Sequence, residues 1–308
     1  FLVPGISRHY VRINPVDVNN PEPDDDPDHG QVLLRNRKPG ERYLFPAAEI
    51  VDAGFLELVR YGIRKAGDPL MEDSLRVIDA VLKADLPGGP CWRRYTHDGY
   101  GQRDDGGAFD NWGVGRLWPL LTGERAHYEL AAGRDIEIYI RALEAFANST
   151  RLLPEQIWDR PDQPENLLFY GGPTGSAMPL MWAHAEYVKL LRSAADGEVF
   201  DFIPEVAERF NPSRKRPRLE VWKFNRRIRS IAPGARLRIQ SVKPFMLHWT
   251  KDEWAHSSDT HSRSTNVAIE FADIDIEQAA RGAIRFTFYW PAESRWEGRD
   301  YAVEIKST

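Results

Sequence analysis

The strongest constraint in this 308-residue sequence is a change of hydrophobic period near residues 211–217. Before it, from about residue 48 to residue 196, apolar side chains recur at the three-and-four spacing of amphipathic helices. After it, short stretches alternate apolar and polar residues, the period of strands with one buried face. Because a Pro-, Arg- and Lys-rich segment separates the two patterns, we expect a helical domain over 1–212 and a β-sandwich module over 217–308.

Apolar stripes and capping residues predict five helices in the first part. They lie within residues 50–65, 73–82, 115–132, 135–148 and 176–193. Pro119 and Gly123 are expected to interrupt the third helix, and Pro179 is expected in the first turn of the last. Long loops rich in Gly, Asp and aromatic residues cover 87–112 and 152–174. Short helices joined alternately by tight turns and long loops are typical of a helical barrel whose long loops gather at one end.

Alternation broken by Pro and Gly predicts the strands of a sandwich in the second part. The alternating stretches are residues 219–222, 236–239, 245–249, 267–271, 284–288 and 301–305.

Composition removes several classes of function. The 41 Lys and Arg against 46 Asp and Glu give a net charge of −5, too mild for a nucleic-acid binder. No apolar run approaches the ~18 residues of a membrane helix, so no membrane span is expected. A single cysteine, Cys91, excludes internal disulfides and a cysteine-based zinc site. His248, His256 and His261 lack ligand-like spacing, so we expect no metal and no cofactor.

Residues 89–101 offer what a sugar ring needs. Arg94 and Asp98 can make charge-assisted hydrogen bonds to hydroxyls, and neighbouring aromatic rings can cover the C–H face of a pyranose. The same Arg and Asp can equally form a pair that only stabilises their own loop. This segment by itself leaves both interpretations open.

Two further segments place polar groups beside apolar ones. Glu155, within 153–159, is either a glutamate favoured at a helix N-terminus or a carboxylate at the mouth of a pocket. Trp182 and His184, within 175–187, either line the same pocket or fill the core. For His184 the core is the favoured interpretation.

Together these segments resemble glycoside hydrolase family 15, the glucoamylase, glucodextranase and trehalase family, in its bacterial branch. Residues 94–101 resemble that branch's Arg-Tyr-Asn-His-Asp-Gly-Tyr-Gly loop, with Thr96 where Asn is common. Three further segments follow in the family's order: residues 115–125, 153–158 and 179–187. The resemblance extends over residues 8–210.

The resemblance implies an (α/α)6 barrel and an exo-acting, inverting hydrolase that releases β-glucose from the non-reducing ends of α-glucans. It implies that Glu155 is the general base and that Arg94 and Asp98 bind hydroxyls of the terminal glucose. Three aromatic residues fall at pocket-lining positions of the family: Tyr95, Trp118 and Trp182. Alternatives are action on dextran, trehalose or isomaltose, glucosyl transfer, and a non-catalytic glucan-binding role. The family also implies a secreted or periplasmic bacterial protein.

Two parts of the family's pattern are missing. The catalytic acid of the family lies in a Trp-Glu-Glu-like segment upstream, but the only Trp-Glu here is Trp296-Glu297, in the β module. The predicted helices number about five, where the barrel needs twelve. With Phe1 in place of an initiator Met, these observations predict the C-terminal portion of a longer precursor. Its partner in an obligate heterodimer would be a separate N-terminal chain that carries the acid.

The β module has a sugar-binding possibility of its own. Residues 247–254 and 289–298 loosely resemble starch-binding sandwich modules, in which exposed aromatic residues stack on glucose rings. Trp254 and Trp296 are the candidates for glycan stacking. The alternative, which the sequence favours, is an accessory domain that holds these tryptophans in its core.

Overall fold

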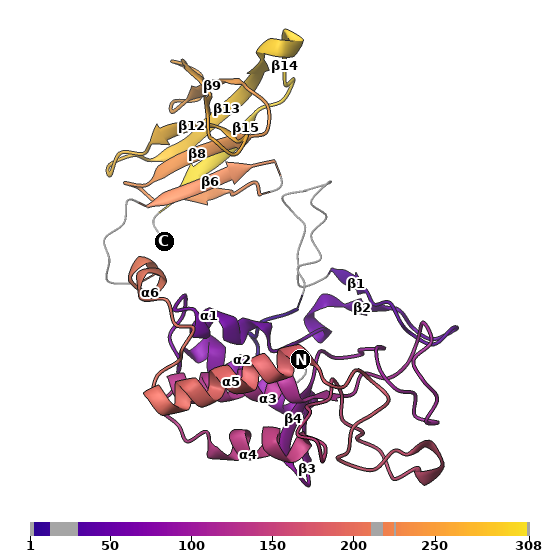
Figure 1. Cartoon of the computed structure of the whole chain (residues 1–308). Coiled ribbons are helices and arrows are strands. Elements are labelled where there is room, and N and C mark those ends of the chain that lie inside the picture. Colours follow the sequence, from indigo (N-terminus) through magenta and orange to yellow (C-terminus); the bar gives the residue numbers. More distant parts are fainter. Residues whose placement is uncertain (1–2, 13–29, 211–217, 225, 307–308) are drawn as a thin grey trace. The chain divides into compact units, whose positions relative to one another are not determined.

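The computed structural model of this protein describes residues 3–12, 30–210, 218–224 and 226–306. The first two ranges form one unit and the last two form a second (Figure 1). The predicted hinge at 211–217 lies outside the described residues.

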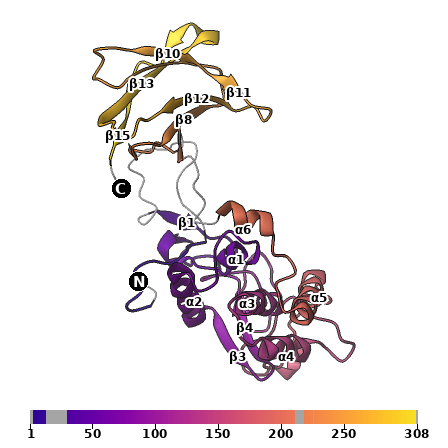
Figure 2. The same cartoon turned by 90° about the vertical axis from the view of Figure 1, so that its left-hand side faces the viewer.

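Helices dominate the first unit, where α3 packs against both α4 and α5 (Figure 2). Asp68 caps α2 by accepting a hydrogen bond from the Leu70 amide, and Pro69 fills the first helical position, which needs no donor. Trp92 and Met71 lie in the core that these helices share. The helices are α1 (Glu57–Arg60), α2 (Pro69–Val81), α3 (Pro119–Ala131), α4 (Glu137–Phe146), α5 (Met181–Asp196) and α6 (Pro204–Phe210).

The predicted helix over 50–65 is wrong except at Glu57–Arg60 and the short 3₁₀ turn Gly54–Leu56 before it. The Val51 amide donates to Thr96 Oγ1 (3.1 Å), and the Thr96 amide donates to the Val51 carbonyl (3.2 Å). These long-range bonds hold the start of the segment in an extended conformation, which overrides its helical spacing.

Pro119 and Gly123 do not interrupt α3. Pro119 is its first residue, where the missing N–H costs nothing. Gly123 lies inside the helix because α5 crosses there: a Cβ at this position would stand 2.5 Å from Cγ of Glu186. Pro179 also differs from its prediction, since it precedes α5 rather than lying in its first turn.

Small sheets that the sequence did not predict flank the helices. An antiparallel sheet in the order β3-β4-β5 joins Lys83–Leu86, Gly89–Arg93 and Leu117–Trp118. A second pair joins β1 (Gln31–Leu33) to β2 (Leu44–Pro46). Strand β4 packs against α3 and α4, so the sheet has a fixed place beside the helices.

The second unit consists of two sheets, seen as two layers in Figure 2, whose inner faces share one hydrophobic core. One sheet has the order β10-β9-β13-β15-β7 with β14 on β13, and the other has the order β11-β12-β8-β6. The strands are β6 (Leu219–Lys223), β7 (Ser230–Ile231), β8 (Arg236–Ser241), β9 (Met246–Thr250), β10 (Ser258–His261), β11 (Arg263–Ser264), β12 (Glu270–Asp275), β13 (Gly282–Trp290), β14 (Arg295–Trp296) and β15 (Tyr301–Ile305).

Trp222 lies at the centre of this core, 1% exposed, with its ring against Phe286 and Tyr301. One predicted strand is displaced. The strand predicted over residues 267–271 lies at Glu270–Asp275 instead. The left-handed backbone of Ala268 (φ 57°) is incompatible with a regular strand, so the strand begins only after it.

A buried ion network joins α1 to α5 in the first unit. Two Arg60 nitrogens donate to the two Glu186 carboxylate oxygens at 3.0 Å each, and a third donates to Asp201 at 2.9 Å. His127 Nδ1 lies 2.8 Å from Glu186. Burial favours a higher pKa for Glu186, but the hydrogen bond with His127 and the charge of Arg60 outweigh it and lower that pKa. This carboxylate therefore stabilises the fold above its ordinary pKa, and the contribution is lost as the pH falls through the lowered value.

We expect Arg60→Met to lower the free energy of unfolding at pH 7 by about 3–5 kcal/mol, since it leaves Glu186 buried without its cation. The loss should shrink as the pH falls through the lowered pKa of Glu186. Arg192→Met is the matched control, because Arg192 is 61% exposed in its pair with Asp196 and should cost less than about 1 kcal/mol. Urea denaturation followed by circular dichroism measures both, and equal losses would contradict the assignment.

Candidate active site

Three segments that are distant in sequence meet beside strand β5. The Ile157 amide donates to the Leu117 carbonyl at 2.8 Å. On the other side of this segment, the Glu155 amide donates to the Ala177 carbonyl at 2.8 Å. Residues 155–157 are therefore held between β5 and the 172–177 loop, with Glu155 two residues from the pairing with β5.

Asp98 forms a fixed pair with Arg94 on the neighbouring loop. Its carboxylate accepts hydrogen bonds from Arg94 Nε (2.8 Å) and Nη2 (2.9 Å) and from the Tyr100 amide (2.9 Å). The side chain is only 1% exposed. The Gly115 amide donates to the Asp98 carbonyl, and a Cβ at Gly115 would lie 2.5 Å from the Asp98 Cβ, so only glycine fits there. The bidentate geometry fixes the orientation of the guanidinium.

Three aromatic rings surround the Arg94 guanidinium. Its central carbon lies 5.2 Å from the ring centre of Tyr95, 4.9 Å from that of Tyr100 and 5.1 Å from that of Trp118. Burial, reinforced by the charge of Asp98, raises the pKa of Tyr95. The structure therefore brings together four of the residues that the sequence singled out, Arg94, Tyr95, Asp98 and Trp118.

Tyr100 connects this cluster to Glu155. Burial raises the pKa of Tyr100, and the charge of the Glu155 carboxylate and a hydrogen bond to it raise that pKa further. The Tyr100 hydroxyl therefore stays protonated and donates to Glu155. The Glu155 carboxylate also faces the Ala177 amide at 3.4 Å, and the residue is 8% exposed. The sequence analysis did not select Tyr100 as a candidate site residue. Its position two residues after Asp98, in the same motif, could have indicated it.

A buried pair locks the loop and the Glu155 segment together. Arg116 is fully buried and donates to Asp159 at 2.7 Å and to the Gln102 carbonyl at 2.6 and 2.8 Å. Arg93 of β4 also donates to Asp159. The guanidinium of Arg116 lies 4.4 Å from the ring centre of Trp158. Three chain segments therefore depend on one carboxylate, and no motif in the sequence pointed to it.

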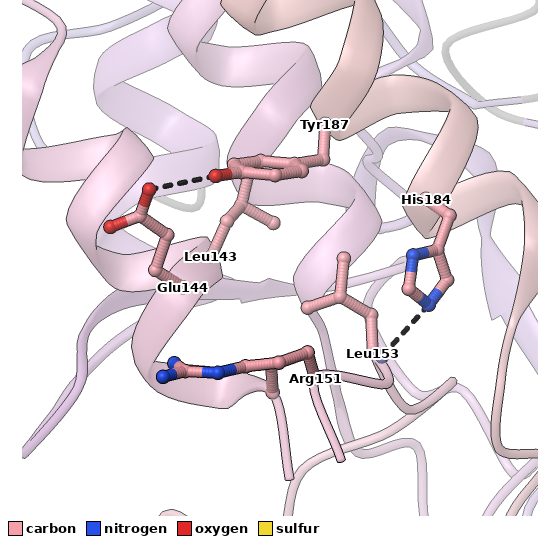
Figure 3. Close-up of a pocket in the computed structure, with 7 residues that line it drawn as sticks. Leu143, Glu144, Arg151, Leu153, His184 and Tyr187 are labelled. Carbon is pink, nitrogen blue, oxygen red and sulfur yellow. Dashed lines mark hydrogen bonds between the residues drawn. The ribbon is translucent and has the colours of Figure 1, made fainter. Parts of the chain in front are cut away.

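A pocket of about 300 Å³ lies behind the Glu155 segment, between α4 and α5 (Figure 3). His184 points its Nε2 at the Leu153 amide, which donates to it at 3.0 Å. The Tyr187 hydroxyl donates to Glu144 across the same pocket at 2.7 Å. His184 is half-buried and lines this pocket rather than filling the core, so the favoured sequence interpretation is wrong. Its role is to hold the chain two residues before Glu155.

The remaining candidate residues lie elsewhere. Trp182 is 69% exposed on α5 and lines a separate pocket with Glu124. Burial and the nearby charge of Glu186 raise the pKa of Glu124 to about 8. Trp254 and Trp296 belong to the second unit and lie outside its core, so the interpretation of them as core residues is wrong.

Comparison with known proteins gives the family. Residues 46–192 match glycosyl hydrolases family 15. The match covers 147 of the 308 residues of this chain. The predicted resemblance is therefore confirmed. A glucoamylase of Clostridium sp. (strain G0005) is 46% identical over 167 residues, which are 54% of this chain and 22% of that protein. A cycloisomaltooligosaccharide glucanotransferase of Niallia circulans is 29% identical over 99 residues, 28% of this chain and 10% of that protein.

A solved structure supports the same assignment. The crystal structure of a bacterial glucoamylase complexed with acarbose matches 66% of this chain with a TM-score of 0.56 and 42% sequence identity. The match covers 27% of that chain, and the Clostridium match covers 22% of its protein, so this chain spans about a quarter of these relatives. Within the part of the chain that the structure describes, every helix is too short or too polar to cross a bilayer.

We expect His184→Ala to lower the free energy of unfolding by about 1–3 kcal/mol, because it leaves the Leu153 amide without an acceptor. His184→Gln is the matched control, since its amide oxygen can accept the same bond and should recover part of the loss. Hydrogen exchange at the Leu153 amide provides the local readout. Unchanged exchange in the alanine variant would contradict the anchoring role.

Proposed function

We propose that this chain is the base-bearing part of an exo-acting, inverting glycoside hydrolase that releases β-glucose from the non-reducing ends of α-glucans. The observation that carries the proposal is the Glu155 carboxylate, which Tyr100 connects to the Arg94–Asp98 pair. The similarity to a Clostridium glucoamylase, and to a glucoamylase structure that holds acarbose, supports the same reaction class.

The Arg94 cluster supplies the binding chemistry for a terminal glucose. Arg94 is still 32% exposed after pairing with Asp98, so its guanidinium can donate to sugar hydroxyls. Trp118 Nε1 is buried without a hydrogen-bond partner among the described residues and offers a further donor. The rings of Tyr95, Tyr100 and Trp118 can cover the apolar face of the pyranose.

Glu155 acts as the general base in this proposal. Its carboxylate takes a proton from a water molecule, and that water attacks the anomeric carbon on the face opposite the leaving group. An acid carboxyl about 6.5–9.5 Å away protonates the glycosidic oxygen, and the separation leaves room for the water. The Tyr100 hydroxyl bonds to the Glu155 carboxylate and can hold it in place for the attacking water.

We further propose that the acid comes from a separate N-terminal chain of the same precursor, which completes an (α/α)6 barrel with α1–α6. Helix α5 presents apolar side chains to solvent, which is typical of a surface that a partner covers. The exposed fractions are 69% for Met181, 69% for Trp182 and 64% for Val188. The second unit would be a β-sandwich accessory module, and the family supports a secreted or periplasmic location.

We expect Glu155→Gln in the assembled protein to lower turnover by about 10²- to 10⁴-fold while glucan binding is retained, because only the base is removed. Tyr43→Ala, an exposed residue of the first unit, is the control. NMR of the first sugar released by the unmodified protein should show the β-anomer. Release of the α-anomer would contradict inversion, and full turnover in the glutamine variant would exclude Glu155 as the base.

The two-chain arrangement predicts that the natural protein contains this chain together with a second, N-terminal polypeptide. Intact-mass analysis and sequencing of both chain ends would detect it. A monodisperse and active preparation of this chain alone would contradict the arrangement, since the base would then have its acid within one chain.

Glucosyl transfer is the second candidate function, favoured by the similarity to a cycloisomaltooligosaccharide glucanotransferase over 28% of this chain. Transfer requires that a sugar hydroxyl replace water as the attacking group. Product analysis at high maltose concentration separates the two reactions, because only transfer yields longer oligosaccharides.

A further inference from the structure

The pocket between α4 and α5 combines an apolar floor with two opposite charges (Figure 3). Leu143 is fully buried and Leu153 is 3% exposed, and both line it. Glu144 and Arg151 lie at its rim. Among the residues that the structure describes, the Glu144 carboxylate bonds only to the Tyr187 hydroxyl, and the Arg151 guanidinium has no ion pair or hydrogen bond. One small pocket therefore holds an anion and a cation that do not pair with each other.

His184 adds a hydrogen-bond donor to the same pocket. The Leu153 amide donates to its Nε2, and a ring nitrogen that accepts a hydrogen bond carries no proton. The ring proton therefore lies on Nδ1. This nitrogen has no acceptor within the described part of the chain, and Figure 3 shows it facing the other lining side chains. A ligand with an acceptor atom can take this bond.

The loop that carries Arg151 is fixed by its own hydrogen bonds. Asn148 Oδ1 accepts from the amides of Thr150 (3.0 Å) and Leu152 (2.9 Å), and the Arg151 amide donates to the Asn148 carbonyl (2.9 Å). These bonds hold Arg151 in a left-handed backbone (φ 65°), which is unfavourable for a residue with a Cβ. The guanidinium thus extends from an ordered backbone, so a ligand would not have to order this loop.

We propose that this pocket binds a free α-amino acid. The ammonium group would bond to Glu144 and the carboxylate to Arg151, both as charge-assisted hydrogen bonds. The side chain would lie over Leu143 and Leu153, and a polar end such as that of glutamine would accept from His184 Nδ1. The volume of about 300 Å³ is at the lower end of small-molecule sites, which suits a ligand of this size.

The balance of charge favours such a zwitterion over other small ligands. A plain carboxylate on Arg151 would share the pocket with the like charge of Glu144, and a plain amine on Glu144 would share it with Arg151. A neutral sugar would leave both charges without a counter-charge. An α-amino acid carries both charges on one carbon atom, so a single molecule can satisfy both rim residues.

The pocket is coupled to the Glu155 segment through one hydrogen bond. His184 accepts from the amide of Leu153, which lies two residues before Glu155. A new bond at Nδ1 would polarise the ring and change the bond at Nε2. The Leu153 amide is therefore a local reporter of binding. An effect on turnover would rest on the proposed function, whereas binding itself does not depend on it.

The test is an NMR titration of the full chain, labelled with ¹⁵N-leucine, with L-glutamine as the probe. The Leu153 amide signal should shift and saturate. Glu144→Gln keeps an acceptor for Tyr187 and removes only the charge, and Arg151→Met keeps most of the stem. Each should weaken binding by about tenfold or more, because each removes one charge-assisted bond. Arg141→Met, 73% exposed on the same helix as Glu144, is the matched control and should leave the affinity unchanged. Circular dichroism confirms that each variant folds.

Modified probes assign each end of the ligand. N-acetyl-L-glutamine lacks the ammonium group, so it should bind the unmodified chain at least about tenfold more weakly, yet match L-glutamine on Glu144→Gln. The α-amide of L-glutamine lacks the carboxylate and should behave in the same way with Arg151→Met. The proposal is overturned by the absence of a saturable shift up to about 10 mM L-glutamine, or by an unchanged affinity in either folded variant. Equal binding of the acetylated probe to the unmodified chain would also overturn it. No turnover is needed, so an inactive first unit leaves the result readable.

Discussion

One buried carboxylate, that of Asp159, holds the candidate active site together. It accepts hydrogen bonds from Arg93 on β4 and from Arg116 on the loop before β5, and it is only 3% exposed. Asp159 lies four residues after Glu155 in the same segment. Its bonds to Arg93 and Arg116 therefore also hold the segment of the proposed base against the loop that carries Asp98. Removing this carboxylate would leave the fully buried Arg116 short of a counter-charge, which is costly in a low-dielectric interior. The position of Glu155 is therefore fixed by electrostatics as much as by packing.

Two buried polar atoms in the segments that form the site lack hydrogen-bond partners within the part of the chain that the structure describes. Trp118 Nε1 and Gln156 Oε1 are buried without partners among the described residues, and Gln156 directly follows Glu155. Buried polar atoms are almost always paired in folded proteins, so these two atoms are exceptions among the described residues.

The sequence predicted the longer helices and the longer strands of the second unit, and it failed where distant segments touch. Apolar periodicity located α2, α4 and most strands of the second unit, because burial of one face imposes a period on the residues themselves. It failed over 50–65, where hydrogen bonds to Thr96 hold the chain extended. It also failed at Gly123, which looks like a helix breaker yet allows α5 to cross at Glu186. Neither reason is visible in local spacing.

For the site, the sequence by itself determined the identity of the chemical groups and the resemblance to a family. Arg94, Asp98 and Glu155 stand in short segments that resemble motifs of the family, so they could be selected from the sequence alone. Only the tertiary structure decided which groups meet. In the structure, the Tyr100 hydroxyl bonds to Glu155, and Trp182 lines another pocket. Trp254 and Trp296 lie outside the core of the second unit. The reason is that these contacts join strands and loops through pairing and buried charges between distant residues, which leave no periodic trace in the chain.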